Sequence, residues 1–402
     1  MSGGRTGRPR VAVVAEFYPS RRDPVLGIWA HRQAIAARDA GADVRVLVLH
    51  RLVPPRASLA AGAGGAAAAL AARMGEPRRQ LRDGIPVAYV PYVSPPRGRS
   101  YPSWGAWAAP ALALALRHLA GSFAFDLLHA HNAVPAGDAV RRSRLARPLV
   151  VSVHGGDVFY TAGRGTAGAS AVAHGLGAAR LVLANSEGVA DLARTHGAGE
   201  TRVVHLGADL PAAQRLGRRD GPPTLVTVAH LIARKRHGDV LRALSVLGQR
   251  HPTLRYAVIG EGPERVALEG LAARLGVSER VDFLGQLDPQ QALERARRCT
   301  LFVMPSTDEA FGVAYVEAMA AGLPAIGCRG EPGPEEIAAA GDGFMLVPPG
   351  DIERLTQRID ELLSDPQRLR EAAQRARATV AAQFTWERCG EQTLAAYEHA
   401  IR

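Results

Sequence analysis

The stretch from Glu309 to Glu317 combines two acidic side chains, eight residues apart, with the expected start of a helix. A short apolar run typical of a buried strand precedes it, and residues 313–321 have the pattern of a helix. The first N–H groups of a helix lack intrahelical acceptors and attract anions. A diphosphate would therefore fit against the backbone of Phe311 and Gly312.

Glu309 lies in the loop and Glu317 two turns into the helix, so both carboxylates can face the end of the strand. Such a pair can accept hydrogen bonds from two separate polyol groups, for example a sugar hydroxyl and a ribose diol. A solvated helix face is the alternative reading of Glu317. Its neighbours Val313, Val316 and Met319 are apolar, which predicts a half-buried carboxylate that needs partners.

Lys235 is the only lysine among the 49 basic residues. Survival of one lysine by chance is one explanation. The other is that a compact ammonium enters a phosphate pocket that a planar guanidinium cannot enter. Lys235 comes six residues after a strand expected at 224–229, and this position favours phosphate binding. His230 follows the same strand directly and either donates to the same group or caps the turn.

Two further loops follow predicted strands, and open parallel sheets bind ligands at the carboxyl ends of their strands. Gly260, Glu261 and Gly262 form one of them, although short Gly turns are often purely structural. His154 follows a strand at 149–153 and precedes two glycines, so its ring would project where a backbone can approach closely. A histidine packed in the core is the alternative.

The sequence predicts no metal site. Asp-x-Asp occurs nowhere in the chain, and His129 and His131 alternate at a strand end without an evident third ligand. One of the two histidines could still line a ligand site. Positive side chains and helix dipoles would then stabilise a phosphate leaving group in place of a metal ion.

The composition is that of a globular protein, with 47% hydrophobic and 22% charged residues, and 402 residues suggest two domains. A net charge of +11 suits nucleic acid, an anionic membrane surface or a phosphorylated substrate, but no basic motif supports a nucleic-acid module. The three cysteines form no C-x-x-C pair, and no apolar run approaches the ~18 residues of a membrane span. We expect a cytoplasmic protein with no nucleic-acid partner, and weak peripheral contact with the inner face of the membrane stays open.

Strand-like runs alternate with helical patterns in both halves, which predicts an α/β protein of two Rossmann-like, doubly wound domains. The expected strands are 11–17, 44–49, 127–130, 149–153, 181–184 and 202–205, then 224–229, 254–259, 281–284, 301–304 and 325–327. Residues 57–102 are rich in Ala, Gly, Pro and Arg and are expected to form loops and a mobile helix. The expected boundaries are an N-terminal domain at 10–206, a linker at 207–223, a C-terminal domain at 224–380 and a final helix at 381–402.

Taken together, these features resemble the retaining glycosyltransferases of family 4, which have the GT-B fold. The segment from Glu309 to Glu317, with Phe311-Gly312 inside it, is similar to the E-x7-E motif of that family. His154-Gly155 resembles its His-Gly step, and Gly27 resembles the glycine of its first, diphosphate-facing loop.

The remaining landmarks of the family also occur in order. His230 and Lys235 correspond to its Arg-x4-Lys, with His in place of Arg, and Arg234 and Arg236 are candidates to compensate. Residues 207–209 resemble its Gly-Val-Asp linker, and Trp386 with Tyr397 resembles the closing helix that crosses back to the N-terminal domain. Residues 331–336 depart from its more usual Gly-Gly-x-x-Glu region.

The resemblance implies that two domains face each other across a cleft, with the acceptor on the N-terminal side and a nucleotide diphosphate sugar on the C-terminal side. Glu317 would hold the ribose, Lys235 with the amides of Phe311 and Gly312 the diphosphate, and Glu309 a sugar hydroxyl. His154 would contact the sugar near the reacting carbon. The remaining expected donor-binding residues are Gly27, His230, Gly260 and Glu261.

The implied function is retaining transfer of a hexose-type sugar from a UDP- or GDP-sugar by same-face displacement, with no metal cofactor. The acceptor would be a glycan, a lipid-linked sugar or a small molecule. The alternatives are a nucleotide-sugar-binding protein without transferase activity and a related phosphorylase or epimerase. A nicotinamide dehydrogenase fits poorly, because neither half has a complete G-x-G-x-x-G with its acidic partner.

Overall fold

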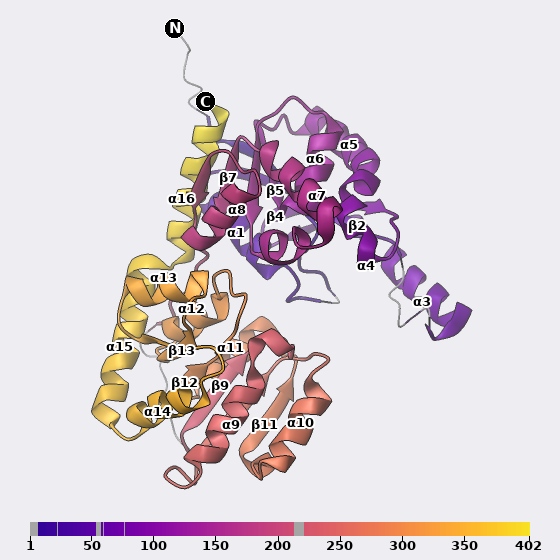
Figure 1. Cartoon of the computed structure of the whole chain (residues 1–402). Helices are drawn as coiled ribbons and strands as arrows, with labels where there is room; N and C mark the ends of the chain where they lie inside the picture. The colour runs from indigo at the N-terminus through magenta and orange to yellow at the C-terminus, as the bar shows by residue number, and fades with distance from the viewer. Residues whose placement is uncertain (1–6, 22, 54–57, 59, 76, 213–220) are drawn as a thin grey trace. The chain divides into compact units, whose positions relative to one another are not determined.

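The computed structural model describes residues 7–21, 23–53, 58, 60–75, 77–212 and 221–402, and its elements form two compact units (Figure 1). Unit 1 comprises residues 1–204 and 389–402, and unit 2 comprises residues 205–388. Each unit is built around its own β-sheet, and helices connect successive strands within it.

The sheet of unit 1 has eight strands in the order β3-β4-β2-β1-β5-β6-β7-β8. All neighbouring pairs are parallel except β3 with β4. The strands are β1 (Arg10–Ala15), β2 (Asp43–Arg51), β3 (Arg79–Arg82), β4 (Ile85–Tyr92), β5 (Leu127–His131), β6 (Leu149–Val153), β7 (Leu181–Ala184) and β8 (Thr201–Val203). Strand β7 is apolar throughout, β1 is apolar after Arg10 and β6 is apolar except for Ser152, as expected for a parallel sheet covered on both faces.

Strand β1 lies between β2 and β5, so the chain order reverses at the β1/β5 pair. In this pair Ala15 is opposite His131, which brings the loops after both strands to the same edge of the sheet. A reversal of this kind opens a crevice at the carboxyl ends of the two strands.

The helices of unit 1 are α1 (Ile28–Asp39), α3 (Gly62–Met74), α4 (Arg97–Ser100), α5 (Trp104–Ser122), α6 (Asp138–Ser143), α7 (Gly165–Gly177) and α8 (Glu187–Thr195). The last helix of the chain, α16 (Trp386–Ile401), contributes its residues from Cys389 onward to this unit. Gln33 Nε2 donates to Thr393 Oγ1 at 3.2 Å, and Gly390 packs so closely on Ala36 that a Cβ would overlap its backbone. These contacts attach α16 to α1.

The sheet of unit 2 has six parallel strands in the order β11-β10-β9-β12-β13-β14. They are β9 (Thr224–Val228), β10 (Arg255–Ile259), β11 (Val281–Gly285), β12 (Leu301–Val303), β13 (Ala325–Cys328) and β14 (Phe344–Val347). The helices are α9 (His237–Leu247), α10 (Arg265–Arg274), α11 (Pro289–Arg297), α12 (Val313–Ala320), α13 (Pro332–Ala340), α14 (Ile352–Leu363) and α15 (Pro366–Gln383). Here the order reverses at β9/β12.

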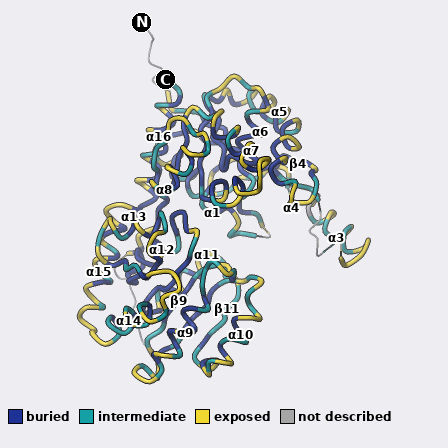
Figure 2. Tube along the Cα trace, viewed as in Figure 1, coloured by how far each residue is buried: buried dark blue, intermediate teal, exposed yellow. Residues whose placement is uncertain are grey.

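Figure 2 shows that the strands of both units are buried while the outer faces of the helices are exposed. In unit 2 the core joins strand residues such as Leu225, Val258 and Leu301 to helix residues such as Leu244 and Ile359, all fully or almost fully buried. This burial is the main stabilising contribution to the unit.

The expected α/β class is confirmed, and the expected strands are present with ends shifted by one or two residues. The interpretation of 57–102 as loops and a mobile helix is wrong for residues 79–92, because β3 and β4 lie there and join the sheet, whereas α3 is a helix in the expected segment. The error has a physical cause. Pro86 and Pro91 argue against a strand, yet β4 turns both prolines outward and buries Val87, Tyr89 and Val90 between them. Part of the expected linker, residues 213–220, lies outside the described residues.

Candidate functional site

Two loops meet at the carboxyl ends of β9 and β12, where the strand order of unit 2 reverses. Lys235 comes from the loop after β9, and its ammonium donates a hydrogen bond to Glu309 Oε2 in the loop after β12. The Lys235 side chain is 11% exposed and that of Glu309 10%. Thr307 N donates to Arg234 O at 2.9 Å and ties the two loops together. Lys235 is thus more buried than we expected for a side chain that reaches a phosphate.

Glu309 is held in place through both its carboxylate and its backbone N–H. Ser306 Oγ donates to Glu309 Oε2 at 2.9 Å, and the N–H of Glu309 itself donates to Glu331 Oε2 at 2.8 Å. Burial lowers the pKa of Lys235, and the charge of Glu309 opposes this shift. Burial also raises the pKa of Glu331, which the N–H of Glu309 opposes. The site therefore holds desolvated charges of both signs within hydrogen-bonding reach.

The helix start expected after Gly312 is present, since α12 begins at Val313. Gly312 has φ 88°, and a Cβ there would overlap the ring of Tyr315. The ring of Phe311 is buried, with its centroid 5.6 Å from that of Phe384. Backbone N–H groups, not the phenyl ring, are therefore what this turn can offer a ligand.

The expectation that Glu317 is half-buried is wrong, because Glu317 is exposed. It lies on the open face of α12 with Val313 and Ala314, which are partly exposed, whereas Val316 and Met319 are buried. Of the apolar residues that suggested burial of Glu317, Val316 and Met319 pack into the core, whereas Val313 shares its open face. Glu317 is thus accessible to a ligand from the same side as the helix start.

Glu331 was missed by sequence reasoning as a residue of this site. It precedes α13, whose Gly333 lies so close to Phe311 that a Cβ would overlap its Cα, and Gly333 N donates to Glu309 O at 3.3 Å. The position of Glu331 after the predicted strand at 325–327 was the available signal.

His230 is exposed, and its Nδ1 lies 3.4 Å from the carbonyl oxygen of Glu261. Of the two arginines that could replace a missing guanidinium, Arg234 has Nη1 3.9 Å from Glu309 Oε2. Arg236 instead donates from Nε to Asp239 Oδ2 at 2.6 Å. Arg234 is therefore the arginine that contributes positive charge to the site.

The loop of Gly260, Glu261 and Gly262 packs directly against the end of β9 and the residues after it. A Cβ at Gly260 would overlap the carbonyl of Ala229, and a Cβ at Gly262 that of Leu231. Glu261 is exposed and forms an ion pair with Arg265 at 3.0 Å. This close backbone packing explains why both positions are occupied by glycine.

In unit 1, His154 lies directly after β6 and edge to edge with His131, with the ring planes 6° apart and the centroids at 5.2 Å. The two imidazoles also share a hydrogen bond, since His154 Nε2 lies 2.9 Å from His131 Nδ1. Burial lowers the pKa of His154 to about 3, so its ring is neutral near pH 7. The ring of Trp29, at the start of α1, lies 6.0 Å away.

The row of imidazole rings continues into the core through His129, whose ring centroid lies 4.5 Å from that of His131. His129 Nδ1 lies 2.7 Å from Tyr397 OH and its Nε2 lies 2.8 Å from Ser152 Oγ. Burial lowers the pKa of His129 to about 3. His129 is therefore a satisfied core histidine, while His131 lies between it and the site edge.

Four buried polar atoms at this edge have no hydrogen-bond partner among the described residues. They follow or end three adjacent strands, β5, β6 and β7, and are His131 Nε2, Asn132 Oδ1, His154 Nδ1 and Asn185 Oδ1. Buried polar groups are almost always paired, so this row calls for a polar ligand or water. Asn132 and Asn185 were missed by sequence reasoning, although each directly follows an apolar strand.

Gly27 forms the end of the loop between β1 and α1. It has φ 71°, and a Cβ would overlap the carbonyl carbon of Phe17. Only glycine fits this position without moving the loop. Gly27 and His154 belong to unit 1, whereas the other expected site residues belong to unit 2.

Within the described ranges, no group of three or more His, Cys, Asp or Glu side chains has an arrangement that could hold a metal ion. Cys299, Cys328 and Cys389 are free and buried. Among the same residues, no helix combines the length and hydropathy needed to span a bilayer.

Two family models match this chain, one in each half. The model described as Glycosyltransferase Family 4 matches residues 27–211, and the model described as Glycosyl transferases group 1 matches residues 211–379. The D-inositol 3-phosphate glycosyltransferase of Nocardia farcinica is 31% identical over 241 residues, which are 55% of this chain and 53% of that protein. The matched segment thus spans about half the length of this curated relative.

Solved structures with the same fold cover almost the whole chain. Sucrose-phosphate synthase from Thermosynechococcus elongatus superposes with a TM-score of 0.76 at 22% identity, over 98% of this chain and 99% of that one. HepE from Anabaena, solved in complex with UDP and glucose, superposes with a TM-score of 0.70 at 20% identity, over 97% and 99%. Both likenesses establish the fold of the two domains as GT-B.

Proposed function

We infer that the chain is a glycosyltransferase with the GT-B fold, since the models that match its two halves both describe glycosyltransferases. We propose that it is a retaining enzyme that moves a hexose-type sugar from a UDP- or GDP-sugar to an acceptor, without a metal cofactor. The observation that carries this proposal is the contact between Lys235 and Glu309 beside the start of α12.

The chemistry of this site fits a nucleotide diphosphate sugar. Lys235, Arg234 and the first N–H groups of α12 supply positive charge and donors for a diphosphate. Glu309 would accept from a hydroxyl of the transferred sugar once the ammonium turns to the phosphate. Glu317, exposed on the same helix, would accept from the ribose diol. His230, Gly260 and Glu261 would border the nucleotide.

Catalysis would depend on stabilising the departing diphosphate. Charge develops on the phosphate oxygen as the bond to the sugar breaks, and preorganised donors are most effective where such charge develops. In same-face displacement the acceptor hydroxyl attacks from the side of the leaving group, and the departing phosphate oxygen takes its proton. No protein nucleophile is needed, so positioning supplies much of the remaining rate enhancement.

His154 would contribute to this step by hydrogen bonding. Its pKa of about 3 means that the ring is neutral at pH 7 and is not a proton reservoir. Its Nδ1 is buried without a partner among the described residues, which suits a sugar hydroxyl. Gly27 would allow the loop after β1 to approach the diphosphate closely.

The acceptor would be a glycan, a lipid-linked sugar or a small molecule bound by unit 1. Weak contact with an anionic membrane surface is part of the proposal, because the chain has a net charge of +11 and α5 exposes Trp107 and Leu114, seven residues apart on one face. Co-sedimentation with phosphatidylglycerol vesicles at low and high salt tests this contact, which should weaken as salt rises.

The donor is tested by thermal shift of the full chain with UDP-, GDP- and ADP-sugars. A donor at 100 times its dissociation constant adds about 2.7 kcal/mol to the free energy of unfolding. NMR of the product then reports whether the anomeric configuration of the donor is kept. No shift with any nucleotide sugar, or an inverted product, contradicts the proposal. Donor hydrolysis without an acceptor product would point to a binding protein, and phosphate-dependent cleavage to a phosphorylase.

A further inference from the structure

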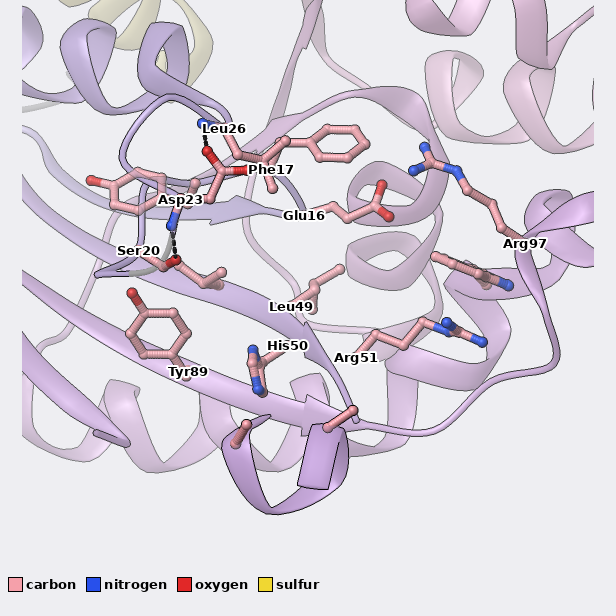
Figure 3. Close-up of a pocket in the computed structure, with 15 residues that line it drawn as sticks. Glu16, Phe17, Ser20, Asp23, Leu26, Leu49, His50, Arg51, Tyr89 and Arg97 are labelled. Atoms are coloured by element: carbon pink, nitrogen blue, oxygen red, sulfur yellow. Dashed lines mark hydrogen bonds between the residues drawn. The ribbon is translucent and has the colours of Figure 1, made fainter. Parts of the chain in front are cut away.

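Unit 1 contains a cavity of about 520 Å³ at the carboxyl ends of β1, β2 and β4, a size typical of small-ligand sites (Figure 3). Every residue that lines it belongs to unit 1. It lies beside the β1/β5 reversal, where a crevice is expected, and on the opposite side of β1 from the row of unpartnered polar atoms. The donor site proposed above does not use this cavity.

Glu16, directly after β1, brings a desolvated carboxylate to the cavity. Tyr101 OH donates to Glu16 Oε2 at 2.7 Å, which fixes one oxygen. Among the described residues Glu16 forms no ion pair. Burial raises the pKa of Glu16, and the nearby charges of Arg97 and Arg51 oppose that shift. A carboxylate held in this way has an oxygen left to accept hydrogen bonds from a ligand.

Arg97 supplies the matching donors. Its guanidinium carbon lies 4.3 Å from the ring centroid of Tyr101 and 5.1 Å from that of Phe17, so the group is stacked between rings. Figure 3 shows its guanidinium and the Glu16 carboxylate pointing toward one another. Arg97 has no carboxylate partner in the part of the chain that the structure describes, and stacking leaves its edge N–H groups available.

The rest of the lining combines a second carboxylate with apolar surface. Asp23 Oδ1 accepts from the N–H groups of Val25 and Leu26 at 3.2 and 3.0 Å, which holds the carboxylate at the cavity. Phe17 and Leu49 add apolar surface. Acceptors, donors and apolar faces arranged together match a sugar ring, which has hydroxyls at its edge and C–H groups on its faces.

The charges of the lining disfavour other ligand classes. Glu16 and Asp23 balance Arg51 and Arg97, and Arg51 is already engaged by Ser94, whose Oγ accepts from its Nε at 2.7 Å. A phosphate or polyphosphate would meet two carboxylates without net positive charge. A purely apolar ligand would leave Glu16 desolvated with one donor.

We propose that this cavity binds a neutral sugar residue, with Glu16 accepting from its hydroxyls and Arg97 donating to a ring or hydroxyl oxygen. The proposal rests on the proposed function only in identifying that sugar as part of the acceptor. It assigns acceptor recognition to a neutral sugar and not to a phosphate or a carboxylate of the acceptor.

The test measures binding of methyl α-glucoside, methyl α-mannoside, maltotriose, glucose 6-phosphate and glucuronate to the full chain by saturation-transfer NMR. The variants are Glu16→Gln, which keeps the volume and the Tyr101 contact, and Arg97→Met. Arg99→Met is the matched control, since Arg99 is exposed on the same short helix and does not line the cavity. The affinities for UDP and GDP are measured on each sample as a check of folding and of the donor site.

At least one neutral sugar should bind, and Glu16→Gln and Arg97→Met should each weaken it about 10-fold or more, as loss of a charged hydrogen bond does. Arg99→Met should leave neutral-sugar binding unchanged, and every variant should keep the nucleotide affinity of the parent chain. Tighter binding of glucose 6-phosphate or glucuronate than of the neutral sugars would overturn the proposal. So would the absence of neutral-sugar binding up to about 100 mM, which corresponds to a binding free energy weaker than about −1.4 kcal/mol. Absence of binding of both UDP and GDP to the unmodified chain would instead count against the proposed function.

Discussion

Lys235 donates a hydrogen bond to Glu309 across 74 positions of sequence. Each side chain is about one-tenth exposed, so each charge neutralises the other in a largely desolvated site. A diphosphate would compete for the ammonium and release the carboxylate for a sugar hydroxyl. Donor binding would then exchange one set of charged hydrogen bonds for another, with Ser306 holding Glu309 in place throughout.

Glu309→Gln and Lys235→Ala should each lower kcat/KM by about 10²-fold or more, the loss expected for one preorganised electrostatic group. Steady-state kinetics with the donor identified by thermal shift measure the effect. Glu269→Gln is the control, because Glu269 carries an exposed carboxylate in the same unit, paired with Arg265. Parent-like kinetics of Glu309→Gln would show that this carboxylate does not contact the sugar.

The stability of the same pair should be strongly non-additive. Lys235→Met leaves the buried carboxylate of Glu309 without its cation, whereas Lys235→Met combined with Glu309→Gln removes both charges. We expect the double variant to unfold at a higher temperature than the single Lys235→Met variant, with a coupling free energy of about 1–3 kcal/mol. Differential scanning calorimetry of the four proteins of the cycle measures it. If the destabilisation of the double variant equals the sum of the effects of the two single substitutions, the pair is exposed and uncoupled.

The buried histidines should make unit 1 sensitive to acid. Burial lowers the pKa of His129 and His154 to about 3 in the folded chain, against about 6.5 when unfolded. The unfolded chain therefore binds more protons between these values. The free energy of unfolding should fall as the pH decreases from 6.5 toward 3, by about 1.4 kcal/mol per pH unit for each histidine.

Urea unfolding of His129→Gln between pH 6.5 and 5 tests this dependence, since one of the titrating groups is removed. Its stability should fall less steeply with decreasing pH than that of the parent chain. His174→Gln is the control, because His174 is exposed in the same unit. A slope for His129→Gln equal to that of the parent would mean that His129 is protonated in the folded state.

Gly27→Ala should destabilise the loop between β1 and α1. The residue has φ 71°, and its Cβ would overlap the carbonyl carbon of Phe17, so the loop must move. The left-handed conformation alone costs about 1–2 kcal/mol, which lowers the melting temperature by several degrees. Gly199→Ala is the control, since a Cβ at Gly199 meets no atom within 4 Å. Equal melting temperatures of the two variants would contradict the steric argument.

Transfer activity should persist in EDTA. The sequence contains no Asp-x-Asp pattern, and Lys235, Arg234 and the start of α12 provide the positive charge that a metal ion would otherwise supply. Initial rates with and without EDTA, and after addition of Mg²⁺ or Mn²⁺, measure this. A rate that EDTA abolishes and Mg²⁺ restores would require a metal site that the proposal does not contain.

Local patterns in the sequence were sufficient to predict most of the helices and strands. Apolar runs such as Leu149–Val153 gave the central strands, and the position of Gly312 gave the start of α12, because burial periodicity and turn chemistry act over a few residues. The exceptions were the segment with β3 and β4, where two outward-facing prolines hide a strand, and β14 (Phe344–Val347), which was not predicted.

The tertiary structure decided which residues come into contact. Strand order places β9 beside β12 and β1 beside β5, and no periodicity within a strand specifies its neighbour, since pairing depends on contacts distant in sequence. The sequence alone singled out Lys235, Glu309 and His154 by type and position. Only the folded chain brings Lys235 onto Glu309, joins His154 to His131, and turns Glu16 toward Arg97.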